Sequence, residues 1–170
     1  MAFDYSNWFP FFVYGSLMPG QSNFYLWQAA VVQARPGQLY NARLYRLGQY
    51  PILVDYPEQV VQGVIIDLDH VDYLKTVQIV DQLEQFDPQQ PEKGIYRRMI
   101  RPVLTARNEW IQAWVYVGDP LLTANLPSVI GNDWATQQNY DSQAIATTIF
   151  GQIARINSLK FRHFYLSQKD

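Results

Sequence analysis

The chain has 170 residues, of which 48% are hydrophobic, 15% aromatic and only 16% charged. This composition predicts one globular domain with a substantial core, and it excludes a disordered or fibrous protein. Thirteen Lys and Arg residues against 15 Asp and Glu residues give a net charge of −2. So little positive charge does not favour a phosphate backbone, and we expect no nucleic-acid partner.

Cysteine is absent from the chain, and the histidines are His70 and His163. This inventory excludes disulfides, thiolate nucleophiles and metal sites rich in Cys or His, so we expect no metal. The remaining chemistry belongs to carboxylates, phenols, hydroxyls and the backbone. The first residues lack a basic leader, and no apolar run approaches the length that spans a membrane. We therefore expect a soluble, cytoplasmic protein with no membrane partner.

The first part of the chain predicts short strands separated by turns. An aromatic and β-branched run predicts a strand from Phe11 to Tyr14, and the Gly-Ser-Leu-Met-Pro-Gly stretch after it predicts a turn. The next segments predict a helix and two strands around a loop: helix Phe24 to Val32 closed by Pro36 and Gly37, strand Gln38 to Leu47, a loop bracketed by Pro51 and Pro57, and strand Val60 to Leu68.

A helix from about Val71 to Phe86 follows, for which Asp67 or Asp69 could provide the start. At the helical repeat its apolar stripe is formed by Tyr73, Val77 and Val80, and Glu84 falls in the middle of that stripe. A carboxylate among core positions has a raised pKa and suits general acid–base catalysis. The alternative is that Glu84 reaches solvent or pairs with a basic residue on the following strand, namely Arg97, Arg98 or Arg101.

Ile95 to Thr105 and Trp110 to Val117 predict a β-hairpin in which Ala113, Val115 and Val117 alternate with Trp114 and Tyr116. Because Arg97 and Arg98 take opposite faces of the first strand, one of them is expected to point inward toward the helix carboxylates. A charged edge strand is the alternative.

A second helical pattern lies near the end of the chain. Its apolar positions are Ile145, Ile149, Ile153 and Ile156. We expect residues 1–134 to form the domain and residues 135–170 to form a C-terminal helical extension packed on it. A basic tail that grips a partner or a membrane surface is the alternative reading of this extension.

A second candidate site is the strand end Tyr14-Gly15-Ser16-Leu17. Glycine allows the chain to turn there with its N–H groups exposed, and such a group of donors can hold an anion or a developing oxyanion. A plain Gly-Ser turn is the alternative.

Several segments between about Phe11 and Val117 occur together in one order. They are Phe12 to Leu17, Gly37-x-Leu39-Tyr40, Tyr50-Pro51, Val61-x-Gly63-x-Ile65, Asp81-x-Leu83-Glu84-x-Phe86-Asp87-Pro88, Tyr96-x-Arg98 and Ala113 to Tyr116. In this order they resemble the γ-glutamylcyclotransferase-like family, in particular its small bacterial and γ-glutamylamine cyclotransferase-type members. The chain departs from the family pattern in the longer Gln-Gln-Pro-Glu-Lys-Gly segment before Tyr96 and in its C-terminal extension.

The resemblance implies an α+β fold: a small mixed β-barrel with flanking helices and a cavity at one end. It implies that Glu84 is the catalytic general acid and base, and that Tyr14, Gly15, Ser16 and Leu17 bind the substrate. The implied reaction is an intramolecular aminolysis with a lyase-type outcome, in which a small γ-glutamyl substrate yields 5-oxoproline and a free amine without a metal or cofactor. The alternative is a non-catalytic small-molecule binding module of the same fold.

Overall fold

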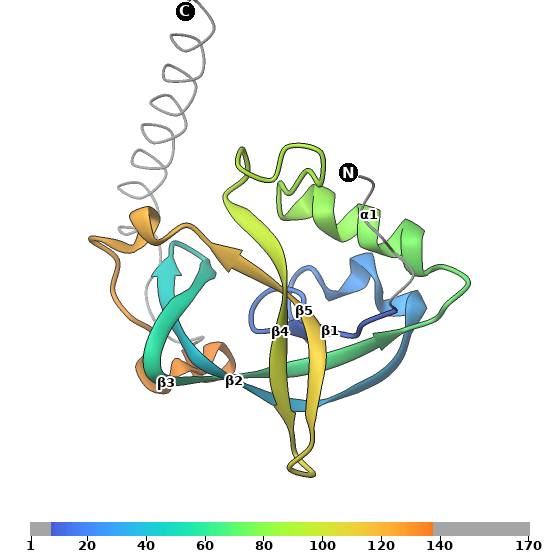
Figure 1. The fold of residues 1–170 in the computed structure, drawn as a ribbon, viewed down its shortest axis with the longest axis horizontal. Coiled ribbons are helices and arrows are strands. Elements are labelled where there is room, and N and C mark those ends of the chain that lie inside the picture. The colour runs from blue at the N-terminus through green and yellow to red at the C-terminus, as the bar shows by residue number, and fades with distance from the viewer. Residues whose placement is uncertain (1–7, 138–170) are drawn as a thin grey trace, which may run out of the picture.

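The computed structural model describes residues 8–137. Five strands and the helix α1 form the frame of this part of the chain (Figure 1). In chain order the elements are β1 (Phe11–Val13), β2 (Val31–Leu47), β3 (Tyr50–Leu68), α1 (Tyr73–Leu83), β4 (Tyr96–Thr105) and β5 (Trp110–Gly118), with five short 3-10 helices, η1 (Phe24–Leu26), η2 (Gln28–Ala30), η3 (Pro120–Thr123), η4 (Ile130–Asn132) and η5 (Trp134–Gln137).

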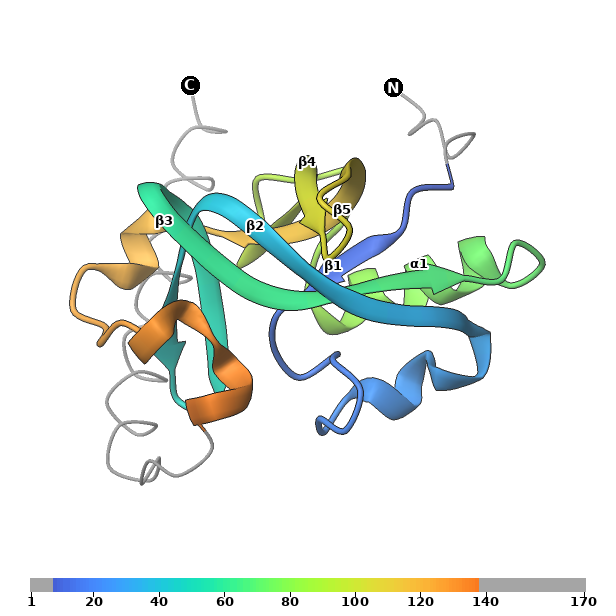
Figure 2. The ribbon, with the colours of Figure 1, turned by 90° about the horizontal axis from the view of Figure 1, so that it is seen from below.

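The strands close into a barrel in the order β1-β3-β2-β4-β5. β1 pairs with β3 in the antiparallel direction and with β5 in the parallel direction through Phe11 and Trp114, so the barrel is mixed. The long hairpin of β2 and β3 curves across the molecule, as Figure 2 shows from below. The fold class predicted from the sequence is therefore confirmed. The expected β4–β5 hairpin is also present, with residue pairs that run from Tyr96 opposite Gly118 to Leu104 opposite Trp110.

Most buried side chains of the strands belong to two core clusters on opposite faces of the sheet, and Leu47 and Ile52 belong to a third, smaller cluster. Phe12, Val103, Ala113 and Val115 belong to a cluster with members on all of the strands, which places it inside the barrel. Phe11 and Trp114 point the other way, into a cluster that also contains buried residues of α1. The predicted alternation along β5 is confirmed, and from Ala113 onward both of its faces are buried because α1 covers the outer one.

α1 buries the stripe that its sequence predicts. Tyr73, Val77 and Val80 are buried against the outer face of the barrel. The residue before the helix is Asp72, while Asp69 accepts a hydrogen bond from the backbone N–H of Val71. The two predicted start residues are therefore wrong: Asp67 belongs to β3, and Asp69 lies in the turn before the helix.

The predicted loop between Pro51 and Pro57 is wrong, because β3 runs through both prolines. Asn41 and Glu58 adopt positive φ opposite one another, and the Asn41 side chain accepts a hydrogen bond from the Glu58 backbone N–H. The ladder register shifts at this point. A β-bulge of this kind takes proline without breaking the strand.

The predicted helix from Phe24 to Val32 is also wrong in type and length. The segment forms η1 and η2, and β2 already begins at Val31. Pro36 and Gly37 therefore lie inside β2, where Gly37 pairs with Gly63 of β3. A Cβ atom on Gly37 would meet the Ile65 side chain at 2.7 Å, so close packing inside the barrel accounts for this glycine.

The chain after β5 packs back on the β2–β3 hairpin. The Asn132 side chain accepts a hydrogen bond from the backbone N–H of Leu44 and donates one to the side chain of Gln59. The segment from Gly131 to Trp134 is thus held against the β2–β3 hairpin by hydrogen bonds of Asn132. The predicted C-terminal helix with its four isoleucines lies outside the described residues, and the domain boundary at 134 stays a prediction.

None of the helices in the described part of the chain has the length and apolar character needed to cross a membrane.

Gly63 offers a test of the barrel. A Cβ atom at this position would lie 2.5 Å from the backbone carbonyl of Val13 and 2.5 Å from the ring of Phe12. We expect Gly63→Ala to lower the free energy of unfolding by about 1–3 kcal/mol, because a rigid neighbour must shift. Denaturant unfolding measures the change. The control is Gln62→Ala on the same strand, expected within about 1 kcal/mol of the parent; equal effects of the two substitutions would contradict the close packing.

Candidate active site

Glu84 lies at the C-terminal cap of α1 rather than inside a longer helix. The helix ends because Gln85 adopts φ 55°, and the backbone N–H of Phe86 donates to the carbonyl of Asp81. The Gln85 N–H donates to the carbonyl of Gln82, which completes a Schellman motif. Glu84 still follows the buried stripe, so the turn holds its side chain at the end of the helix beside the barrel.

A cavity of about 250 Å³ brings Glu84 together with the strand end of β1. The residues predicted to bind substrate, Tyr14, Gly15, Ser16 and Leu17, all line this cavity. The β2–β3 turn and the start of β4 supply further lining residues, including Tyr50, Pro51 and Tyr96. The residues that the sequence singles out in two separate segments thus line the same cavity.

Gly15 is required by a close contact and not by its backbone angle. It is absent from the described residues with positive φ. A Cβ atom on Gly15 would lie 2.6 Å from the ring of Pro51. The predicted turn is present, because the Met18 N–H donates to the Gly15 carbonyl, but the close contact is what requires glycine: it lets the first strand approach the β2–β3 hairpin at the edge of the cavity.

The backbone after β1 is held in place while three of its donors stay unused. The Ser16 carbonyl accepts from the Asn23 backbone N–H, the Ser16 hydroxyl accepts from the Asn23 side chain, and the Leu17 carbonyl accepts from the Trp27 indole. Among residues 8–137, the N–H groups of Gly15, Ser16 and Leu17 have no acceptor. Consecutive backbone donors at a cavity wall suit a carboxylate or an oxyanion.

The Glu84 carboxylate makes no hydrogen bond or ion pair with any described residue. Its side chain is partly buried at the cavity wall. Burial, and secondly the charge of Asp81, raise the pKa of Glu84 from its ordinary 4.5 to about 7. The carbonyl groups at the end of α1 act in the same direction, because they carry partial negative charge. A carboxylate with this pKa exchanges protons readily near neutral pH.

The basic residues that could have neutralised Glu84 are engaged with other carboxylates. The pairs are Arg97 with Glu92 at 3.8 Å, Arg98 with Asp81 at 3.5 Å and Arg101 with Asp55 at 3.0 Å. Of the alternatives left open for the arginines, Arg98 is the residue that points inward. Glu84 therefore is not a member of a surface ion pair.

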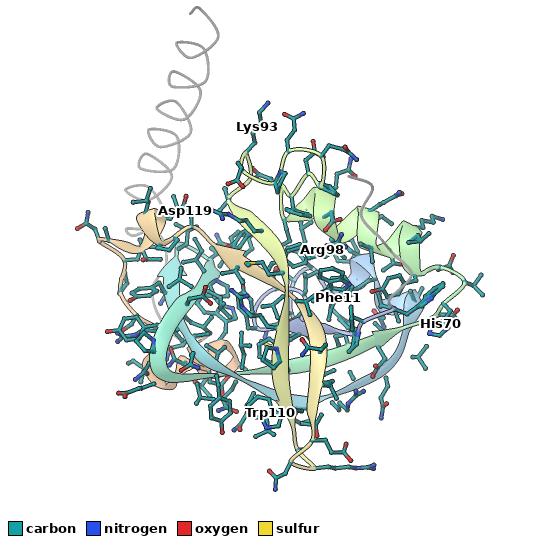
Figure 3. All side chains as sticks on the ribbon, in the orientation of Figure 1. Phe11, His70, Lys93, Arg98, Trp110 and Asp119 are labelled. Carbon is teal, nitrogen blue, oxygen red and sulfur yellow. The ribbon has the colours of Figure 1, made fainter. Side chains whose placement is uncertain are left out.

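Asp81 and Arg98 form a buried pair between α1 and β4. Figure 3 shows Arg98 between the helix and the strands, whereas Lys93 projects from the loop above. The Tyr116 hydroxyl donates a hydrogen bond of 2.6 Å to the Asp81 carboxylate, and the Arg98 guanidinium lies 4.7 Å from the ring centre of Trp114. Burial raises the pKa of Asp81, while Arg98 and the Tyr116 hydrogen bond oppose that shift.

Two further tyrosines are fixed by their hydroxyl groups. The Tyr14 hydroxyl donates to the carbonyl of Tyr116 at 2.6 Å, and the Tyr96 hydroxyl donates to the carbonyl of Pro51 at 3.1 Å. Burial, and next the charge of Glu84, raise the pKa of Tyr96. Both phenols therefore stay protonated and act as fixed walls of the cavity.

Sequence reasoning gave no role to several lining residues. Leu47, Gly48 and Tyr50 reach the cavity from the β2–β3 turn, and Ile95 reaches it from the loop before β4. That loop contains the longer segment in which the chain departs from the family pattern. It packs closely against the end of α1, because a Cβ atom on Gly94 would lie 2.4 Å from the Gln85 carbonyl. In the sequence, the family matches at Tyr50-Pro51 and Tyr96 were the signals that could have identified this part of the cavity wall.

In the part of the chain that the structure describes, no three metal-ligating side chains gather into a group that could hold an ion. His70 lies away from the cavity, where its ring contacts Trp8 at 4.4 Å between ring centres (Figure 3).

Comparison with known proteins agrees with this architecture. A sequence model described as gamma-glutamyl cyclotransferase, AIG2-like, matches residues 11–136. No curated protein sequence matches the chain.

Solved structures share the fold at low sequence identity. YkqA from Bacillus subtilis has a TM-score of 0.57 at 20% identity, with 76% of this chain and 40% of that one covered. An AIG2-like protein from Mus musculus has a TM-score of 0.50 at 22% identity, with 79% and 89% covered. A gamma-glutamyl cyclotransferase has a TM-score of 0.50 at 17% identity, with 71% and 69% covered. The chain thus spans well under half the length of YkqA.

Glu84 should make stability depend on pH. Because its pKa is raised in the folded state, folding binds a proton between pH 4.5 and about 7, and stability falls as pH rises through this window. Relative to the parent, Glu84→Gln is expected to gain about 2–3 kcal/mol between pH 4.5 and 8. Denaturant unfolding across this range measures it. The exposed Glu92→Gln serves as control, and a pH-independent difference for Glu84→Gln would contradict the raised pKa.

Asp81→Asn tests the buried pair. Its removal leaves the Arg98 guanidinium buried without its carboxylate, so we expect a loss of about 3–5 kcal/mol in the free energy of unfolding. Asp55→Asn, which breaks the more exposed pair with Arg101, is expected to cost less than about 1 kcal/mol. Thermal or denaturant unfolding of both variants gives the comparison. Equal losses would show that the buried pair holds α1 no better than a surface pair.

Proposed function

The chain belongs to the AIG2-like γ-glutamyl cyclotransferase family, and from this premise we propose that it is an enzyme that cyclises the γ-glutamyl group of a small γ-glutamyl amine or γ-glutamyl amino acid. The products are 5-oxoproline and the free amine. The reaction is an intramolecular acyl transfer: the substrate's own amino group replaces the leaving amine. A small γ-glutamyl compound is the partner that this proposal requires.

One observation carries the proposal. Glu84 is a partly buried carboxylate without an ion-pair or hydrogen-bond partner among the described residues, and it shares a cavity with the strand end of β1. An ionisable side chain kept desolvated without a partner destabilises the fold, and such groups cluster at catalytic sites. A structural role would place one of the nearby arginines against it.

The proposed chemistry uses Glu84 as base and then as acid. Its carboxylate accepts a proton from the substrate α-ammonium group, and the amine nitrogen attacks the γ-carbonyl carbon. A new carbon–nitrogen bond closes the five-membered ring. Collapse of the intermediate breaks the original amide bond as Glu84 returns this first proton to the departing nitrogen. Glu84 then accepts the surplus proton of the ring nitrogen and passes it to the released amine, which leaves as an ammonium ion. Atoms and charges balance without an external reactant.

We assign the strand end to charge stabilisation. The unused N–H groups of Gly15, Ser16 and Leu17 would receive the substrate's α-carboxylate or the oxyanion of the intermediate, and Tyr14 would form the wall beside them. Fixed backbone donors suit this task because they need no reorganisation during the reaction. The enzyme's main contribution is then to hold the substrate chain folded, since an amine already tethered to its target reacts far faster than a free one.

Glu84→Gln keeps the shape of the side chain and removes the base. We expect the release of 5-oxoproline from γ-glutamyl compounds to fall by at least about 100-fold, while the same compounds still raise the melting temperature of the variant. In the parent, kcat/KM should rise with pH with a midpoint near 7, because the base must be ionised.

Glu92→Gln is the matched control and should retain the parent rate. Turnover of Glu84→Gln near the parent rate would exclude the proposed role of Glu84. If the parent protein is stabilised by γ-glutamyl compounds and releases no 5-oxoproline, the chain is a binding module of the same fold.

A further inference from the structure

The cavity carries a single formal charge. Among its described lining residues, Glu84 is the one side chain that ionises near neutral pH, and no Lys, Arg, His or Asp contributes to the wall. Asp81 and Arg98 form a buried ion pair, and neither residue lines the cavity. The lining therefore offers no second charge to a substrate.

Several hydroxyl groups of the wall are already engaged. The hydroxyls of Tyr14, Tyr96 and Tyr116 donate to protein acceptors, and the Ser16 hydroxyl accepts from Asn23. A ligand group that needed several new side-chain hydrogen bonds would find few in this part of the cavity.

Apolar and aromatic side chains from three other elements form a further part of the cavity wall. Leu47 and Tyr50 come from the β2–β3 turn, Leu83 from the last turn of α1 and Ile95 from the loop before β4. Tyr50 is 41% exposed and Leu83 36% exposed, so this side reaches solvent. We refer to these four residues as the apolar rim.

The proposed chemistry fixes which part of the substrate meets the apolar rim. The α-amino group lies at Glu84 and the α-carboxylate or oxyanion at the Gly15–Leu17 backbone, so the leaving amine extends toward the remaining wall. A charged substituent there would lose its water against Leu47 and Ile95 with no opposite charge to replace it. An uncharged apolar substituent would bury favourably.

We propose that the preferred substrates are γ-glutamyl amides whose leaving amine carries an uncharged apolar substituent, alkyl or aryl. This inference rests on the proposed function, and it adds the chemical class of the leaving group. A cationic amine is disfavoured because the rim has no carboxylate. An anionic amine is disfavoured because the rim has no cation and Glu84 lies close by.

A matched series of substrates on the full chain tests the inference. The series comprises γ-glutamyl methylamide, an unbranched γ-glutamyl alkylamide, and amides of the same chain length that end in an ammonium or a carboxylate group. We expect kcat/KM for 5-oxoproline release to be about 10-fold or more higher for the alkylamide than for either charged amide. Methylamide, which does not reach the rim, should be turned over with intermediate efficiency.

The series separates failure of the inference from failure of the function. If no amide in the series, methylamide included, yields 5-oxoproline, the proposed function fails. If methylamide is cyclised and a charged amide equals or exceeds the alkylamide, the function stands and the assignment of the leaving group is overturned.

A rim substitution provides a second measurement. Tyr50→Glu adds a carboxylate to the rim and should lower the ratio of kcat/KM for the alkylamide over the ammonium amide by about 10-fold. Tyr40→Glu is the control, because Tyr40 is similarly exposed at 43% and lies outside the cavity, against Trp110. An unchanged ratio in a folded Tyr50→Glu protein would overturn the inference, and the substrate series on the parent decides the matter if that variant does not fold.

Discussion

The buried ion pair between Asp81 and Arg98 connects α1 to the barrel, and the position of the candidate site depends on it. Asp81 precedes Glu84 by three residues, so the contact that seats the helix also holds the C-terminal end of the helix beside the barrel. Tyr116 completes the arrangement, because its hydroxyl binds Asp81 while its carbonyl accepts from Tyr14. One chain of contacts thus runs from the helix carboxylates through β5 to the strand end of β1.

This arrangement gives neighbouring carboxylates opposite environments. Asp81 is paired with a guanidinium and accepts a hydrogen bond from a phenol, whereas Glu84 has neither partner among the described residues. The charge retained on Asp81 disfavours ionisation of Glu84, so the pair that anchors the helix also adjusts the proton affinity of the residue at its end. The ion pair that anchors the helix and the proposed acid–base residue are therefore separated by a single helical turn.

Local patterns in the sequence predicted the elements that are regular. Periodicity located the buried stripe of α1, and alternation located the β4–β5 hairpin and placed Arg97 and Arg98 on opposite faces, whereas the structure shows that Arg98 is the one that points inward. The end of α1 escaped prediction because it depends on Gln85 in a conformation usually left to glycine. The full length of β3 was not predicted, because an irregularity in the strand pairing at Asn41 allows Pro57 to lie within the strand.

The two halves of the site differ in the same way. Glu84 and the Gly15 region could be recognised in the sequence, because one is a carboxylate in an apolar helical stripe and the other is a glycine turn directly after a strand. Leu47 and Ile95 are ordinary apolar residues whose place at the cavity follows from tertiary packing alone, so no short pattern marks them. The close contact of Gly15 with Pro51, which joins the two walls, likewise follows from how the barrel curves.

β1 has two duties that are inseparable. Its three residues, Phe11–Val13, join β3 to β5 and so form the seam of the barrel, and the chain continues from them directly into the cavity wall. The cavity consequently requires that β1 stay paired with β3 and β5. A ligand bound in the cavity should therefore stabilise the whole domain. Thermal unfolding that separates β1 from β3 and β5 should release that ligand in the same cooperative step.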